Sequence, residues 1–128
     1  MSTNEAIRLR GIRGATTVES NTKAAILEAT HELLSAIIEA NDVQQDDVAS
    51  IFFSTTPDLN AEFPAVAARE IGWSHVALMC AHEMPVPGSL PMCLRILMHA
   101  NTSKAQSELQ FVYLRGARVL RPDLANES

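Results

Sequence analysis

The sequence predicts a single domain in which one mixed β-sheet is covered by helices, an α/β or α+β sandwich. Three observations support this prediction. The length of 128 residues is that of one domain. Strand-like and helix-like segments alternate along the chain in the order β-α-β-α-β-α-β-β. The last two strand-like segments meet near Gly116, which indicates a hairpin at the C-terminal end.

The first strand is expected at residues 7–13, where the side chains alternate between two faces. Ile7, Leu9 and Gly11 share the more apolar face with Arg13, which ends it just before Gly14. An arginine at that point either passes the end of the strand into water or meets a buried anion. Both possibilities remain open from the sequence.

A long helix is expected at residues 22–40, with Asn21 as its N-cap. Its apolar positions recur at helical spacing and predict one buried face. They are Ile26, Leu27, Thr30, Leu33, Leu34, Ile37 and Ile38. This helix is interpreted as scaffold, and residues 44–47 as a polar turn.

The rest of the chain repeats the alternation in shorter segments. Pro64 is a good first-turn residue and Gly72 a good helix stop, while Ser89 is a suitable cap for a third helix. The tail at residues 125–128 is expected to be disordered. The predicted elements are strands at 48–55, 75–82, 110–115 and 117–121, and helices at 64–71 and 89–100.

Composition narrows the class of protein. A net charge of -5 argues against a nucleic-acid partner, because phosphate binding needs a basic surface. The apolar stretches fall far short of the roughly 20 residues that cross a bilayer, and the N-terminus has no signal-peptide core. We therefore expect a cytoplasmic protein without a membrane partner. Cys80 and Cys93 are expected to be reduced thiols, and their spacing predicts no metal site.

The ten basic residues are eight arginines and only two lysines. Arginine offers a planar fork that matches a carboxylate or phosphate bidentately. The bias is explained either by a pocket for a small anion or by plain compositional preference.

No standard catalytic motif is present, so the candidate residues are charged or polar groups at element ends. Glu83 directly follows an apolar strand and either lines a cleft or is solvated. Arg95 lies at the edge of the apolar arc of the expected third helix, where it either reaches water or faces a desolvated pocket. Tyr113 is expected in the core or in a pocket wall. Arg121, just before Pro122, is expected at a rim.

Several ordered segments resemble the monofunctional trimeric chorismate mutases of the Bacillus type. The first and last of these segments are the strongest, and together they cover nearly the whole chain. They are Arg10–Val18, Ser54–Leu59, Phe63–Ala65, Cys80 followed by Glu83, Cys93–Arg95, Val112–Leu114 and Val119–Leu124.

The resemblance implies an α+β domain, three copies of which form a pseudo-barrel with active sites between neighbouring subunits. It also implies an enzyme of phenylalanine and tyrosine biosynthesis that rearranges chorismate to prephenate without cofactor or metal. This pericyclic reaction needs no nucleophile, base or redox centre, in agreement with the absence of standard catalytic motifs from the sequence.

The same resemblance implies roles for individual residues. Arg13 resembles the arginine that contacts a substrate carboxylate and the ether oxygen, and Arg95 the cation that faces the breaking C–O bond. Glu83 resembles the carboxylate that holds the substrate hydroxyl, with Cys80 beside it. Tyr113 resembles the tyrosine that contacts a carboxylate.

Four further residues complete the implied binding site. Phe63 and Arg69 resemble residues brought by the adjacent chain, and Leu120 and Arg121 resemble C-terminal residues that close over the pocket. Two departures bear on binding strength. Val66 stands where some members have a lysine, and Met79 stands where a small hydroxyl residue occurs.

Two other functions remain open at this point. One is a trimeric deaminase of reactive imines, which shares a barrel-like trimer and an interfacial arginine. The other is a non-catalytic sensor that binds an acid of the aromatic pathway without turnover.

Overall fold

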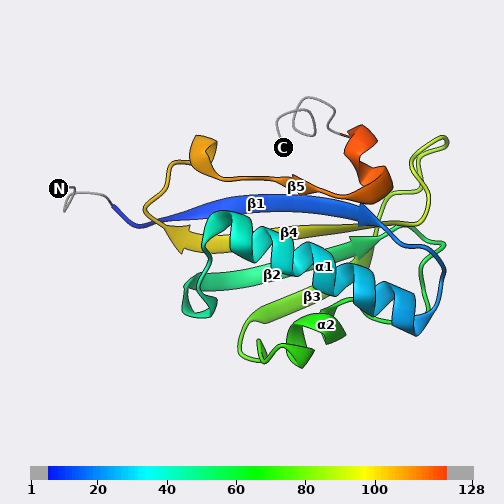
Figure 1. Cartoon of the computed structure of the whole chain (residues 1–128), viewed down its shortest axis with the longest axis horizontal. Coiled ribbons are helices and arrows are strands. Elements are labelled where there is room, and N and C mark those ends of the chain that lie inside the picture. Colours follow the sequence, from blue (N-terminus) through cyan, green and yellow to red (C-terminus); the bar gives the residue numbers. More distant parts are fainter. Residues whose placement is uncertain (1–5, 121–128) are drawn as a thin grey trace.

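The computed structural model describes residues 6–120, so Arg121 and the tail at 125–128 lie outside the described residues. One mixed sheet with the strand order β3-β2-β4-β1-β5 forms the centre of the fold, which confirms the predicted α+β class (Figure 1). The strands are β1 (Arg8–Thr17), β2 (Val48–Thr55), β3 (Ala77–His82), β4 (Cys93–Thr102) and β5 (Val112–Tyr113). The helices are α1 (Lys23–Asn41) and α2 (Ala65–Glu70), with 3-10 turns η1 (Gln45–Asp47), η2 (Gln106–Glu108) and η3 (Arg115–Leu120).

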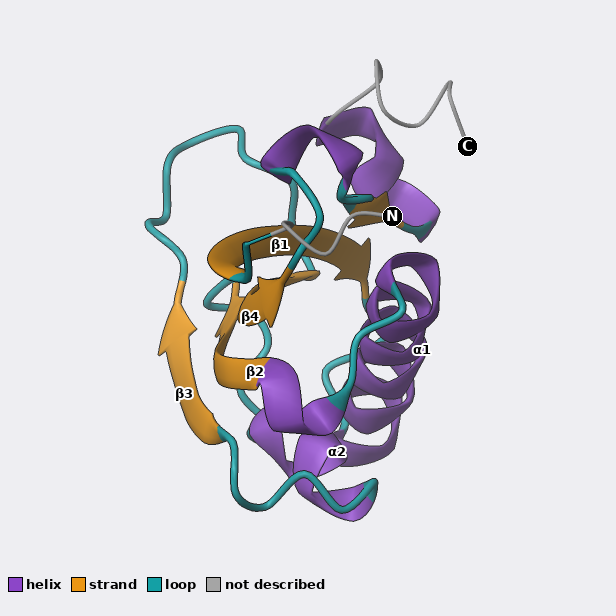
Figure 2. Ribbon diagram, turned by 90° about the vertical axis from the view of Figure 1, so that its left-hand side faces the viewer, coloured by secondary structure: helices purple, strands orange, loops and turns teal. Residues whose placement is uncertain are grey.

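The sheet is mixed because strand β4 pairs antiparallel with both β1 and β2, whereas β3 and β5 join the two outer sides in parallel. Helices α1 and α2 pack on one face of this sheet (Figure 2). We call that face the helix-covered face and the opposite one the open face.

Helix α1 buries the predicted apolar stripe, and Ile26, Leu33, Leu34 and Ile37 are fully inaccessible to water. The expected N-cap is wrong by one residue. Thr22 caps the helix, because its side-chain oxygen accepts the backbone N–H of Ala25 at 3.1 Å.

The predicted third helix at 89–100 is wrong, because these residues lead into β4, the middle strand of the sheet. Leu94, Ile96 and Met98 lie on the helix-covered face and are buried, while Arg95 and Leu97 between them are only partly exposed. A central strand that carries apolar side chains on both faces gives a nearly continuous apolar run, and periodicity does not distinguish such a run from a buried helix.

The predicted C-terminal hairpin is also wrong. Among the described residues after β4, only Val112 and Tyr113 form a strand, and they pair in parallel with Gly14 and Ala15 of β1. Arg115 then adopts a left-handed φ of 51°, and the chain turns into η3 instead of a returning strand.

The faces of β1 differ from the prediction. Ile12 is the residue packed in the core, at 1% exposure, whereas Ile7 and Leu9 are 65% and 56% exposed. Arg13 therefore belongs to the open face, beyond the reach of α1.

Candidate functional site

One row of side chains crosses the open face of the sheet through four strand pairings. Arg95 of β4 is paired with Ser54 of β2 on one side and with Ala15 of β1 on the other. Ala81 of β3 extends the row beyond Ser54, and Tyr113 of β5 extends it beyond Ala15. Side chains in register on neighbouring strands lie on the same face, so the pairing alone brings Arg95 and Tyr113 to one surface.

A second row runs beside the first. Leu97 is paired with Arg13 of β1 and with Phe52 of β2, and Phe52 with Met79 of β3. The guanidinium carbon of Arg13 lies 5.2 Å from the ring centre of Phe111, a cation–π distance. Phe52 and Met79 are 44% and 58% exposed, so this row presents apolar surface next to a cation.

The two rows form the floor of a cavity of about 310 Å³ on the open face. Its lining combines four of the residues singled out in the sequence with apolar and hydroxyl groups. They are Arg13, Glu83, Arg95 and Tyr113, with Gly14, Phe52, Phe53, Ser54, Met79, Ala81, Ile96 and Leu97.

Glu83 and Arg95 form an ion pair in this cavity, with 3.6 Å between Glu83 Oε2 and Arg95 Nε. The Ser54 hydroxyl donates a hydrogen bond to the same carboxylate oxygen, and the backbone N–H of Glu83 donates to Thr55 at 2.8 Å. Arg95 Nε is buried and has no hydrogen-bond acceptor among the described residues. The side chain as a whole is 42% exposed, so its outer nitrogens remain accessible to a guest.

The end of the cavity next to Arg95 adjoins a small apolar cluster on the open face, made of Ala15, Cys93 and Ala117. Tyr113 and Leu120 pack against this cluster, which we call the Cys93 cluster. Burial raises the pKa of the Cys93 thiol, and the nearby Arg95 charge opposes that shift only in part. Cys93 is therefore a neutral packing group at neutral pH.

Phe63, Arg69 and Cys80 gather at a different surface. Cys80 lies on the helix-covered face of β3, since it is paired with Phe53, and it lines a cavity of about 470 Å³ together with Phe63. Burial raises the pKa of the Cys80 thiol, while the positive charge of Arg69 on α2 lowers it. Phe63 is 68% exposed. Within one chain these residues do not share the open-face cavity with Arg95.

The loops between these elements are tied to each other by short side chains. Asp58 accepts the Thr56 hydroxyl at 2.6 Å and the backbone N–H of Met92 at 2.9 Å, and Thr56 accepts the N–H of Cys93 at 2.9 Å. The hydrogen bond from Thr56, supported by that from Met92, holds the pKa of the Asp58 carboxyl below its ordinary value. This network fixes the first residues of β4, two positions before Arg95.

The loop that carries Phe63 has its own anchor. Asn21 accepts the backbone N–H groups of Asn60 and Ala61 at 2.9 and 3.0 Å and donates to the Asn60 side chain at 2.8 Å. Instead of capping α1, Asn21 therefore fastens this loop to the start of that helix.

Sequence reasoning missed Ser54, Phe52 and Phe111 as members of the site. The alternation within residues 48–55 would have placed Ser54 and Phe52 on one strand face, but no sequence signal sets them opposite Arg95 and Leu97. Val66 lies half-buried in α2 and Met79 in the open-face cavity, so the two departures affect different surfaces.

Residues 6–120 contain no group of three histidine, cysteine or carboxylate side chains arranged to ligate a metal ion. Nor does any helix in that range combine the length and apolar character needed to traverse a bilayer.

Comparison with known proteins gives consistent matches over most of the chain. The family model described as "Chorismate mutase type I" matches residues 9–124. The protein "Chorismate mutase AroH" of Bacillus subtilis (strain 168) is 48% identical over 118 residues, which cover 91% of this chain and 93% of the relative. The protein of the same name from Thermus thermophilus is 51% identical over 117 residues, 91% of this chain and 96% of that protein.

A solved structure has the same fold. It is a chorismate mutase from Clostridium thermocellum, which superposes with a TM-score of 0.84 at 50% sequence identity. The match covers 85% of this chain and 97% of that chain.

Proposed function

This chain belongs to the chorismate mutase type I family, and from that membership we propose that it rearranges chorismate to prephenate at a site built on its open-face cavity. The observation that carries the proposal is the Glu83–Arg95 pair, which lies in one cavity with Arg13 and Tyr113 and leaves a buried Arg95 N–H without an acceptor among the described residues. The reaction belongs to the biosynthesis of aromatic amino acids.

The rearrangement is unimolecular and conserves all atoms and electrons of the substrate. The ether C–O bond breaks while a new C–C bond forms, so neither an enzyme nucleophile nor a proton transfer is required. The raised pKa values of both thiols fit this chemistry, because neutral cysteines are poor nucleophiles. The protein instead supplies shape and a fixed electric field.

Arg95 acts at the ether oxygen. Negative charge builds on this oxygen as the C–O bond stretches ahead of C–C bond formation. A guanidinium already held in place by Glu83 binds the transition state more tightly than the ground state. Partial burial strengthens this interaction, because the local dielectric constant is lower than that of water.

The other groups of the cavity bind the dianionic guest. Arg13 and Tyr113 offer a cation and a phenol to its carboxylates, at the side of the sheet where β1 and β5 run in parallel. Glu83 accepts a hydrogen bond from the substrate hydroxyl with the carboxylate lone pairs that Ser54 and Arg95 leave unused. Chorismate is thereby held in its compact, reactive conformation.

The second part of the site comes from a neighbouring copy in a homotrimer. Phe63, Arg69 and Cys80 lie away from the open-face cavity of their own chain, and the exposed Phe63 ring is available to a neighbour's cavity. The apolar surface of Phe52 and Met79 supports the same assembly, because contiguous exposed apolar area is typical of interfaces. Leu120 closes the pocket from the Cys93 cluster, and Arg121, which lies outside the described residues, acts with it.

Two further properties belong to this proposal. We propose a cytoplasmic location, supported by the two free cysteines, and a single catalytic domain that spans residues 1–128.

The test is to incubate the purified protein with chorismate, follow the loss of its ultraviolet absorbance and identify prephenate as product. Turnover with chorismate and none with reactive imines supports the proposal. Imine hydrolysis without chorismate turnover would establish the deaminase, and chorismate binding without turnover the sensor. A stable monomer in sedimentation at assay concentration would refute the shared site.

A further inference from the structure

The C-terminal segment that follows the site is fastened to the fold by Arg115. This residue comes two positions after Tyr113 and begins η3. Its φ of 51° lies in the left-handed region, which is unfavourable for a side chain as large as arginine. Such a conformation persists where the surroundings hold it in place.

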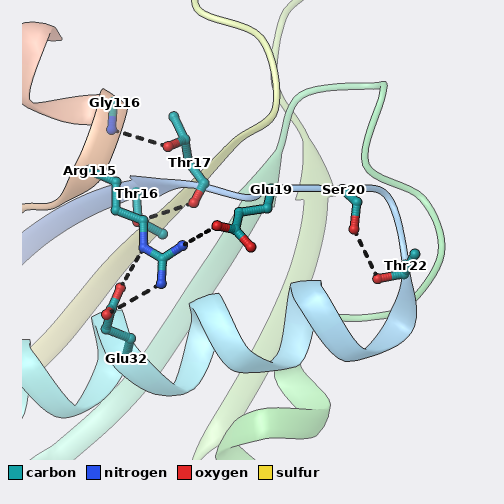
Figure 3. Close-up of polar contacts among 8 residues, drawn as sticks. All are labelled: Thr16, Thr17, Glu19, Ser20, Thr22, Glu32, Arg115 and Gly116. Carbon is teal, nitrogen blue, oxygen red and sulfur yellow. Dashed lines mark hydrogen bonds and ion pairs between the residues drawn. The ribbon is translucent and has the colours of Figure 1, made fainter.

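Two glutamates hold the Arg115 side chain (Figure 3). Its Nε lies 3.0 Å from Glu32 Oε1 and its Nη2 lies 3.5 Å from Glu32 Oε2, which is the paired fork arrangement of arginine with a carboxylate. Its Nη1 lies 4.0 Å from Glu19 Oε1. Glu32 belongs to α1 and Glu19 to the loop between β1 and α1, so Arg115 joins the C-terminal η3 to two neighbouring segments near the N-terminus.

The next residues carry this attachment to the site. The N–H of Gly116 donates to Thr17 Oγ1 at 3.1 Å, and a Cβ at Gly116 would come within 3.0 Å of the Thr17 side chain. Ala117 is fully buried in the Cys93 cluster, on which Tyr113 and Leu120 also pack. A 3-10 helix of six residues such as η3 is weak by itself, so contacts with the rest of the fold decide where the segment lies.

We propose that Arg115 is a positioning residue whose ion pair with Glu32 holds η3 and thereby sets Tyr113 and Leu120 at the Arg95 end of the cavity. The inference rests on the function proposed above and extends it to two residues outside the cavity. Arg115 touches neither cavity, so its effect reaches the substrate through η3 and the Cys93 cluster.

The experiment measures three variants: Arg115→Gln, Glu32→Gln and the double variant that combines these two substitutions. Glu39→Gln is the matched control. Glu39 is an exposed glutamate of the same helix and takes part in none of the ion pairs found in the described part of the chain. The chorismate assay gives kcat and KM for each variant. Hydrogen exchange of the peptide around residues 114–120 reports on η3 without any substrate.

We expect each single variant to raise KM about threefold to tenfold with kcat changed less than twofold. The double variant should be no worse than either single variant, because both remove the same contact. Exchange of η3 should accelerate in all three variants and stay unchanged in Glu39→Gln. This pattern separates positioning from a loss of overall stability, which would reduce the fraction of folded enzyme and so lower the apparent kcat while leaving KM unchanged.

A wild-type KM in the single variants would overturn the positioning role, even if hydrogen exchange of η3 were faster. Additive effects of the two substitutions would overturn the pairing. A wild-type protein without chorismate turnover would instead overturn the proposed function on which the inference rests, and this is distinguishable because the wild type is measured first.

Discussion

The substitution Arg95→Lys tests the electrostatic part of the mechanism. Lysine keeps the positive charge but has a single nitrogen in place of the planar fork. In the structure one nitrogen of Arg95 faces Glu83 at 3.6 Å while the accessible part of the group is left for the substrate. One ammonium group cannot both pair with Glu83 and contact the substrate oxygen, so the variant loses one of these two interactions.

The expected loss follows from the value of one preorganised donor at a developing negative charge. That value is about 3 kcal/mol, which lowers kcat on the order of a hundredfold at 25 °C. The effect on KM should be smaller, because the ether oxygen carries little charge in the ground state.

The assay is the decrease in chorismate absorbance, measured over a range of substrate concentrations. Arg8→Lys is the matched control, because Arg8 is exposed at the first residue of β1 and lines none of the cavities described above. Circular dichroism and urea unfolding verify that both variants keep the fold. A kcat for Arg95→Lys within threefold of wild type would refute the assignment of Arg95 to the ether oxygen.

Four further substitutions test other parts of the structure. Ser54→Ala removes the hydroxyl that donates to Glu83 and should lower kcat/KM about tenfold to a hundredfold in the same assay, since a hydrogen bond to a charged group contributes about 1.5–3 kcal/mol. Glu83→Ala should weaken rate and affinity more than this, and an unaffected Glu83→Ala enzyme would remove the carboxylate from the site. Gly14→Ala would put a Cβ 2.9 Å from the Val112 carbonyl oxygen and 2.8 Å from a side-chain carbon of α1. Urea unfolding should therefore show a destabilisation of about 1–3 kcal/mol. An unfolding midpoint equal to wild type would contradict the close approach of β5 and α1 to Gly14. The Asp58 carboxyl has a lowered pKa in the folded protein, so the stability that it contributes is present above its ordinary pKa near 4 and is lost as pH falls through its pKa in the folded state. Asp58→Asn should therefore reduce the fall of the urea midpoint with acid below about pH 4. An unchanged fall would show that other groups cause the loss of stability in acid.

Local sequence patterns predicted the helices and strands whose formation depends mainly on residues close together in the sequence. Helix α1 could be read from its apolar stripe, since a helix packed on one face needs apolar residues at helical spacing. Strand β2 has the bounds that residues 48–55 predict. The short helix after Pro64 could be read in the same way, because proline suits a first helical turn. These elements are determined within a few residues of sequence.

Strand β4 shows where such patterns fail. Apart from Arg95, residues 94–98 are apolar, because the strand lies in the middle of the sheet and carries apolar side chains on both faces, and this pattern is typical of a buried helix as well. The wrong element also gave Arg95 the wrong neighbours. On a helix its partners would lie three and four residues away, whereas in the sheet they are Ser54 and Ala15.

The sequence by itself determined the family and predicted Arg13, Glu83 and Arg95 as catalytic residues, because these inferences depend on which residue types are present and in what order. Only the tertiary structure decided that Ser54 supports Glu83, that Cys80 faces away from the open-face cavity and that Arg115 reaches Glu32. The physical reason is strand register. The side-chain direction alternates with every residue, and a pairing between distant strands is set by the packing of the whole sheet on α1, which no local segment encodes.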